Sequence, residues 1–184
     1  MIKTSLTDPL VITEIAPPIA RIAGTIGLTF CPGKRQADGM TGQWQRDLAL
    51  DLDRIAQWGA ASVVSVIEMH ELAALGVPDL GLKVRAGSMT WHHLPVEDAH
   101  APAAAFAKPW ADACPVLLRD LRQGRKVLVH CKGGLGRTGT IAALLLIDSG
   151  HAPRDAIGIV HRARPGAIET PEQEAWLLAQ SPEA

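Results

Sequence analysis

The sequence predicts an α/β fold in which a central, mostly parallel and twisted sheet is flanked by helices on both faces. Short strand-like runs alternate with longer helix-like segments through most of the chain, and strands that are joined through helices usually lie parallel. The runs 62–67 and 126–130 are also largely apolar, as is typical of strands that are buried on both faces.

Length and composition favour one globular domain, and residues 1–184 are expected to form it. Hydrophobic residues make up 47% of the chain and charged residues 20%, which excludes disorder as the main state. The formal net charge of −1 provides no overall basic field, so nucleic-acid binding is not expected.

The expected location is cytoplasmic, without membrane insertion. The three cysteines are an odd number without metal-ligand spacing, which fits a reducing compartment. Asp8, Pro9 and Glu14 interrupt any apolar N-terminal segment, so no signal peptide is expected. The aliphatic stretch 141–147 is too short to span a bilayer.

The first third of the chain is expected to contain short strands followed by one helix. Residues 22–30 are rich in β-branched and other apolar residues and are predicted to form an edge strand. Apolar residues recur at helical spacing over 43–58, which predicts a helix that ends at Gly59. Trp44 and Trp58 of this segment are expected in the core.

The rest of the chain alternates between the two kinds of element. Strands are expected at 62–67, 89–96 and 126–130, and helices at 71–75, 79–84, 103–122, 138–149, 154–162 and 171–180. The loops that follow the carboxyl ends of parallel strands meet at one edge of the sheet, where active sites of α/β proteins gather.

Residues 130–139, H-C-K-G-G-L-G-R-T-G, follow a predicted strand and lead into a predicted helix. The glycines let the chain curl so that successive backbone N–H groups point at one centre, which binds a tetrahedral oxyanion. Arg137 adds a planar fork for two phosphate oxygens, and the positive field favours the thiolate of Cys131. The expected substrate-binding residues are Lys132, Gly133, Gly134, Leu135, Gly136 and Arg137.

This decapeptide resembles the Cys-x5-Arg loop of the protein tyrosine and dual-specificity phosphatase superfamily. The resemblance implies a protein tyrosine phosphatase-like fold, hydrolysis through a phosphocysteine on Cys131, and no metal or other cofactor. In that superfamily the hydroxyl at the place of Thr138 donates to the thiolate, although Thr138 could also simply cap the helix. His130 is expected to orient the loop through hydrogen bonds rather than to transfer protons.

A departing alkoxide or phenolate needs a proton from a general acid, and Asp98 is the candidate. It follows the predicted strand 89–96, at the edge of the sheet where the Cys131 loop is expected. The alternatives are a plain turn aspartate, or Glu97 or His100 as the acid. The segment 94–98 resembles the acid loop of the superfamily, with Asp98 in the position of the acid.

The second step needs an oriented water, for which members of the superfamily use glutamines in a late loop. Gln173 matches one of them, and the alternative for Gln173 is an exposed residue in the first turn of a helix. Glu169 stands where the other glutamine often is. A carboxylate near a phosphoryl group is unfavourable, so Glu169 is expected either to point elsewhere or to slow hydrolysis.

The substrate is expected to be a phosphoprotein or phosphopeptide. Phosphoinositide phosphatases of the superfamily often have lysines at the places of Lys132 and Leu135, and only the first is present here, which leaves phosphoinositides or other small phosphate esters as the alternative. The chain further resembles the cyclin-dependent-kinase-associated dual-specificity phosphatases at residues 30–34, 92–98, 133–137 and 166–170. This subgroup implies phosphotyrosine and also phosphoserine or phosphothreonine as substrates, but no particular protein partner.

Two other functions compete with the phosphatase. Residues 134–139 also read G-x-G-x-x-G, the dinucleotide-binding fingerprint, which requires an acidic residue about twenty positions on at the end of a strand. Asp155 has that spacing but falls at a predicted helix start. A non-catalytic phosphate-binding module would need neither the thiolate of Cys131 nor the acid Asp98. The phosphatase is therefore the preferred interpretation.

Overall fold

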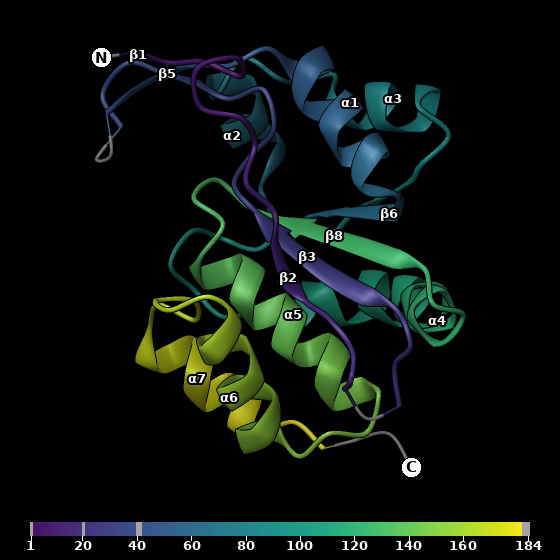
Figure 1. The fold of residues 1–184 in the computed structure, drawn as a ribbon. Helices are drawn as coiled ribbons and strands as arrows, with labels where there is room; N and C mark the ends of the chain where they lie inside the picture. The colour runs from purple at the N-terminus through teal and green to yellow at the C-terminus, as the bar shows by residue number, and fades with distance from the viewer. Residues whose placement is uncertain (1, 20, 40–41, 182–184) are drawn as a thin grey trace.

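A computed structural model describes residues 2–19, 21–39 and 42–181, and its centre is a five-stranded sheet in the order β2-β3-β8-β6-β7 (Figure 1). The strands are β2 (Thr13–Ile15), β3 (Thr25–Thr29), β8 (Lys126–His130), β6 (Ala60–Ser65) and β7 (Thr90–His93). Among these described strands, only the β2–β3 pair is antiparallel. The predicted mostly parallel sheet is confirmed.

Helices cover both faces of the sheet (Figure 1). One face carries α1 (Leu48–Trp58), α2 (Met69–Ala74) and α3 (Leu80–Ala86); the other carries α4 (Ala107–Arg122), α5 (Gly136–Asp148), α6 (Pro153–Ala163) and α7 (Pro171–Leu178). Successive residues of β8 enter different cores, because Leu128 packs with α1–α3 while Val127 and Val129 pack with α4–α7. This two-sided burial explains the apolar run in the sequence.

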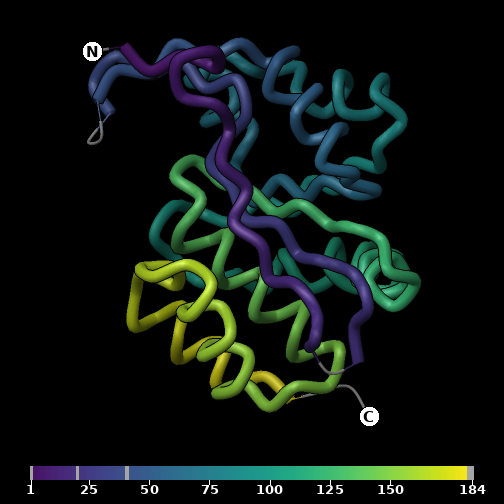
Figure 2. The backbone as a smooth tube through the Cα atoms, in the orientation of Figure 1, coloured from purple at the N-terminus to yellow at the C-terminus, as the bar shows by residue number. Residues whose placement is uncertain are grey.

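The aliphatic stretch 141–147 lies in α5, which is buried along almost its whole length. This helix contacts α4, α6 and α7 as well as strands β3 and β8, so it needs apolar side chains all round. Figure 2 shows it passing between the sheet and the C-terminal helices. Within the described ranges, no helix is both long and apolar enough to cross a membrane.

Residues 22–30 were expected as an edge strand, and this was wrong. β3 is shorter, all five of its residues are buried, and it lies between β2 and β8. The register pairs Glu14 with Gly27 on one side and Gly27 with Leu128 on the other. β2 forms the edge instead, because the chain turns back between β2 and β3 and the two strands pair antiparallel.

Residues 43–58 do not form one helix, as their apolar spacing predicted. The first three form β5 (Gln43–Gln45), which pairs with β1 (Ile2–Lys3) and β4 (Arg35–Gln36) in a small second sheet. The helix begins only at Leu48, because Asp47 is its N-cap and accepts the Leu50 N–H at 3.1 Å. The chain before the cap is therefore free to pair as a strand.

Trp44 is half-buried and belongs to neither hydrophobic core cluster, contrary to expectation, whereas the half-buried Trp58 packs against the core on the α1–α3 face. The ring of Trp44 lies 5.1 Å from that of Phe30, with Lys34 Nζ 4.0 Å from the Trp44 ring centroid. Trp58 donates its Nε1–H to Glu14 Oε1 at 2.6 Å. The polar edge of an indole favours such positions at the margin of a core.

Candidate active site

The loop between β8 and α5 forms the floor of the candidate site, and Gly134 determines its turn. Gly134 has a φ of 75°, and a Cβ at this position would come within 2.5 Å of the Thr29 carbonyl group. No other residue fits so close to the neighbouring strand without moving it. Gly133, by contrast, has open space where a Cβ would lie.

Cys131 lies at the end of β8 and is 3% exposed. The N–H of Gly134 points at its sulfur, with 3.2 Å between N and Sγ. A backbone donor aimed at the sulfur stabilises the thiolate more than the thiol.

Thr138 was expected either to serve the thiolate or to cap the helix, and the capping role is wrong. The helix begins two residues earlier, at Gly136, with Leu135 as its N-cap. Thr138 is buried, and its Oγ1 has no hydrogen-bond partner in the described part of the chain.

His130 is buried and is held by Ser65. Ser65 Oγ lies 2.6 Å from His130 Nε2 and accepts the Nε1–H of Trp91 at 2.8 Å. Since the indole only donates, the hydroxyl proton of Ser65 is left to point to His130 Nε2. The ring proton of His130 is therefore on Nδ1, which lies 3.4 Å from the carbonyl oxygen of Cys131. Burial lowers the pKa of His130 to about 4, so the ring is neutral at pH 7.

Arg137 extends from the first turn of α5 and is 2% exposed. Glu71 of α2 binds it with both oxygens: Oε2 accepts from Nη1 at 2.6 Å and Oε1 accepts from Nη2 at 3.0 Å. Nη1 also donates to the carbonyl oxygen of Val96 at 2.9 Å. Nε is buried and has no partner among the described residues, so the Nε–Nη2 edge is the one that can receive an oxyanion.

The contact with Glu71 keeps both groups charged. Burial alone would lower the pKa of Arg137, but the hydrogen bond that it donates to Glu71 and the negative charges of Cys131, Glu71 and Asp98 outweigh burial and raise the pKa. Burial likewise would raise the pKa of Glu71, and the hydrogen bond to Arg137 outweighs it, so that pKa is lowered. The loop therefore carries a permanent cation.

The loop after β7 brings Asp98 to Arg137. Asp98 Oδ1 lies 2.8 Å from Nη2, and the Asp98 side chain is 65% exposed. Glu97, the competing carboxylate, is directed to His100, with 3.8 Å between Oε1 and Nδ1. His100 Nδ1 also lies 2.8 Å from the carbonyl oxygen of Asp98. Of the two neighbouring carboxylates, Asp98 is the one that pairs with the guanidinium.

Gln173 is fully buried, which excludes the alternative of an exposed helix residue. Its Oε1 accepts the N–H of Glu169 at 3.0 Å, and its Nε2 donates to the carbonyl oxygen of His100 at 3.1 Å. The side chain therefore ties the late loop to the loop that carries Asp98.

Glu169 does not point away from the site, which was one of its two expected arrangements. Its Oε2 accepts the N–H of Gly136 at 2.7 Å. Gly136 is the first residue of α5, and backbone N–H groups at a helix start have no partner within the helix, so they attract a carboxylate.

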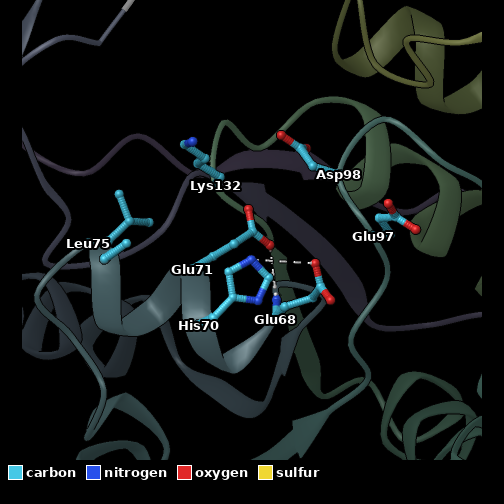
Figure 3. Close-up of a pocket in the computed structure, with 8 residues that line it drawn as sticks. Glu68, His70, Glu71, Leu75, Glu97, Asp98 and Lys132 are labelled. Carbon is cyan, nitrogen blue, oxygen red and sulfur yellow. Dashed lines mark hydrogen bonds and ion pairs between the residues drawn. The ribbon is translucent and has the colours of Figure 1, made fainter.

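An open pocket of about 540 Å³ lies beside the loop (Figure 3). Four carboxylates and one lysine are among the residues that line it. The lining consists of Glu68, His70, Glu71, Ala74, Leu75, Glu97, Asp98 and Lys132. In Figure 3, Glu71 lies between the α2 side of the pocket and Lys132, with Asp98 across from it. The surroundings of the cationic loop are thus mainly acidic.

Glu71 and Ser65 were not expected as site residues. Glu71 was placed only in a short helix, and Ser65 only in a buried strand. The available signal was their position in the chain. Ser65 ends strand β6 and Glu71 follows it, so both lie at the same edge of the sheet as Cys131. The dinucleotide interpretation also fails, because Asp155 lies in the first turn of α6 and not at the end of a strand.

Known proteins that resemble this chain include phosphatases. Residues 39–151 match a family model described as "Polymorphic toxin system, DSP-PTPase phosphatase". Cyclin-dependent kinase inhibitor 3 of Mus musculus is 31% identical over 165 residues, which cover 87% of this chain and 74% of that protein.

Solved structures agree with the sequence comparisons. The crystal structure of a kinase associated phosphatase, with its catalytic site cysteine replaced by serine, has a TM-score of 0.78 and 27% identity over 92% of both chains. The crystal structure of Tk-PTP in the active form has a TM-score of 0.65 and 27% identity, over 91% of this chain and 95% of that one.

Proposed function

The chain belongs to the dual-specificity protein tyrosine phosphatases, and from this membership we propose that it hydrolyses phosphoproteins through a phosphocysteine on Cys131. One observation carries the assignment of residues. A buried sulfur that accepts a backbone N–H and a buried guanidinium with an Nε that has no partner among the described residues lie at the two ends of one glycine-rich loop.

In the first step, the phosphoryl oxygens bind the loop N–H groups and the Nε–Nη2 edge of Arg137. The thiolate of Cys131 attacks phosphorus, a P–S bond forms, and the P–O bond to the substrate breaks. Asp98 takes up a proton from solvent once it has left the guanidinium, and it gives this proton to the leaving oxygen. Because Asp98 is paired with Nη2, a phosphoryl oxygen that binds Nη2 displaces its carboxyl group and frees it to face the leaving group.

In the second step, water attacks the phosphocysteine, a P–O bond forms and the P–S bond breaks, so that inorganic phosphate is released and the thiolate is restored. Asp98, now a carboxylate, accepts the proton of the water. We assign to Thr138 the hydrogen bond to the departing thiolate, which is supported by its buried Oγ1, unpartnered within the described ranges. Both ends of the Gln173 amide are bonded to backbone groups, which supports a positioning role for this residue.

His130 is assigned to hold the start of the loop and not to transfer protons. Its low pKa and its contacts with Ser65 and Cys131 support this role, because both ring nitrogens are engaged by protein groups and neither is free to exchange a proton with substrate.

The acidic surroundings of the loop favour phosphoproteins over phosphoinositides. A phosphoinositide brings further phosphate groups, which the carboxylates of Glu68, Glu71 and Glu97 would repel. Among the described residues, Lys132 is the only lysine or arginine that lines this pocket, and position 135, where a second lysine would help, is leucine. We infer phosphotyrosine and also phosphoserine or phosphothreonine side chains as substrates. We propose a cytoplasmic location, because an odd number of cysteines without metal-ligand spacing fits a reducing compartment.

Hydrolysis of p-nitrophenyl phosphate, phosphopeptides and a phosphoinositide by the whole chain tests this proposal. The expected order is phosphopeptide above phosphoinositide, with full activity in the presence of a chelator, because the loop N–H groups and Arg137 stabilise the phosphoryl charge. Cys131→Ser should abolish turnover while phosphate analogues such as tungstate still bind. Retained turnover in this variant would disprove the phosphocysteine.

A further inference from the structure

Glu169 contacts the anion-binding loop that the proposed function assigns to the phosphoryl group. On the basis of that function, we propose that Glu169 is an internal anion that competes with the phosphoryl group for the Gly136 N–H. Glu169 thereby sets the affinity of the enzyme for phosphate esters.

The contact is close, and it involves a donor of the loop itself. Gly136 belongs to the run of backbone N–H groups between Cys131 and Arg137, and Glu169 Oε2 lies 2.7 Å from its nitrogen. A Cβ on Gly136 would meet the same oxygen at 2.5 Å and the amide of Gln173 at 3.0 Å. The carboxylate therefore packs directly against the loop.

The late loop holds Glu169 in this position. Gln173 Oε1 accepts the N–H of Glu169 at 3.0 Å, and Thr170 Oγ1 caps α7 by accepting the N–H of Gln173 at 3.2 Å. Ile168, directly before Glu169, has a φ of 60°, which a β-branched residue adopts only when its surroundings require it. The backbone is thus fixed on both sides of the carboxylate.

A bound phosphoryl group cannot share this donor without cost. The Gly136 N–H has one hydrogen to donate, and a phosphate oxygen that accepts this hydrogen bond displaces Glu169 Oε2. If the carboxylate stays nearby, two like charges face each other at the buried Gly136 N–H, with solvent screening part of the repulsion because Glu169 itself is exposed. Either outcome weakens the binding of a phosphate dianion relative to a neutral amide at position 169.

The variant Glu169→Gln keeps the size of the side chain and an acceptor oxygen but removes the charge. Glu174→Gln is the matched control, because Glu174 is exposed on α7 and its replacement changes the net charge equally. Calorimetric titration of each protein with inorganic phosphate and with tungstate measures the affinity, and p-nitrophenyl phosphate provides KM and kcat separately.

Glu169→Gln is expected to bind both oxyanions about tenfold more tightly than the wild type and to lower KM, as loss of a competing charged hydrogen bond predicts. Glu174→Gln should match the wild type. Unchanged or weaker oxyanion binding in both Glu169→Gln and Glu169→Ala would overturn the inference. Failure of the proposed function would look different, because the wild type would then not hydrolyse any phosphate ester.

Discussion

Replacing Glu71 tests whether Arg137 depends on this one carboxylate for its orientation. The pair is nearly closed to water, with side-chain exposures of 1% for Arg137 and 11% for Glu71. In Glu71→Ala the guanidinium stays buried and keeps only the Val96 carbonyl oxygen and Asp98 among its described partners. Glu71→Gln keeps one acceptor oxygen in place.

The loss of stability follows from that burial. Removing one partner of a buried ion pair costs about 3–5 kcal/mol. Because two contacts of Arg137 remain, the expected loss of stability in Glu71→Ala is about 3 kcal/mol. Glu71→Gln should lose about 1–2 kcal/mol, because a neutral hydrogen bond replaces a charged one. For a chain of this length, about 3 kcal/mol corresponds to a decrease of roughly 6–12 °C in Tm, which leaves the protein folded at room temperature.

Activity should fall further than stability. The Nε–Nη2 edge of Arg137 is aimed by the two bonds to Glu71, and misplacement by about 1 Å at a reacting centre costs about 100-fold in rate. We therefore expect kcat/KM for p-nitrophenyl phosphate to fall about 100-fold in Glu71→Ala at 25 °C, and less in Glu71→Gln.

Thermal unfolding and steady-state kinetics measure both effects, with the exposed Glu174→Ala as control. A double-mutant cycle with Arg137→Ala isolates the pair, since removing both side chains should cost less than the sum of the single changes. The dependence of Arg137 on Glu71 is refuted if Glu71→Ala has the Tm and kcat/KM of the wild type, because Asp98 and Val96 alone would then hold the guanidinium.

Two further predictions concern the general acid and the buried histidine. Asp98→Ala should slow alkyl phosphate hydrolysis more than hydrolysis of p-nitrophenyl phosphate, whose leaving group needs little help; if Glu97→Ala shows this pattern instead, the acid is Glu97. For His130, the pKa is about 4 in the folded chain against 6.5 when unfolded, so the unfolded state binds more protons between these values and stability falls as pH falls from 6.5 to 4, by about 3 kcal/mol in all. Urea unfolding across this range should show the slope, and His130→Gln should flatten it; an equal slope in both proteins would mean that groups other than His130 cause it.

The candidate anion site could be predicted from the sequence because it is built from consecutive residues. Cys131, the loop N–H groups and Arg137 are covalent neighbours, so a strand followed by a glycine-rich turn and a helix brings them together. The mainly parallel sheet could be predicted for a similar reason, since the alternation of strands and helices is written along the chain.

Patterns that fit two local structures failed. The apolar spacing from Trp44 to Ile55 fits a helix, yet β5 occupies its start because β1 and β4 supply strand partners there. Asp47 was the local signal for the true helix start. The composition of residues 25–29 fits an edge strand as well as an inner strand, and only the pairing with β2 makes β3 an inner strand.

The fold class, the loop proposed to carry the nucleophile and the class of reaction could be predicted from the sequence, because each of these depends on residues that lie close together along the chain. The groups that surround that loop are known only from the folded chain. Glu71, Val96 and Asp98 reach Arg137 from a separate helix and loop, and Glu169 reaches Gly136 from the late loop. Such contacts depend on how helices pack over the carboxyl edge of the sheet, and no local spacing encodes that packing.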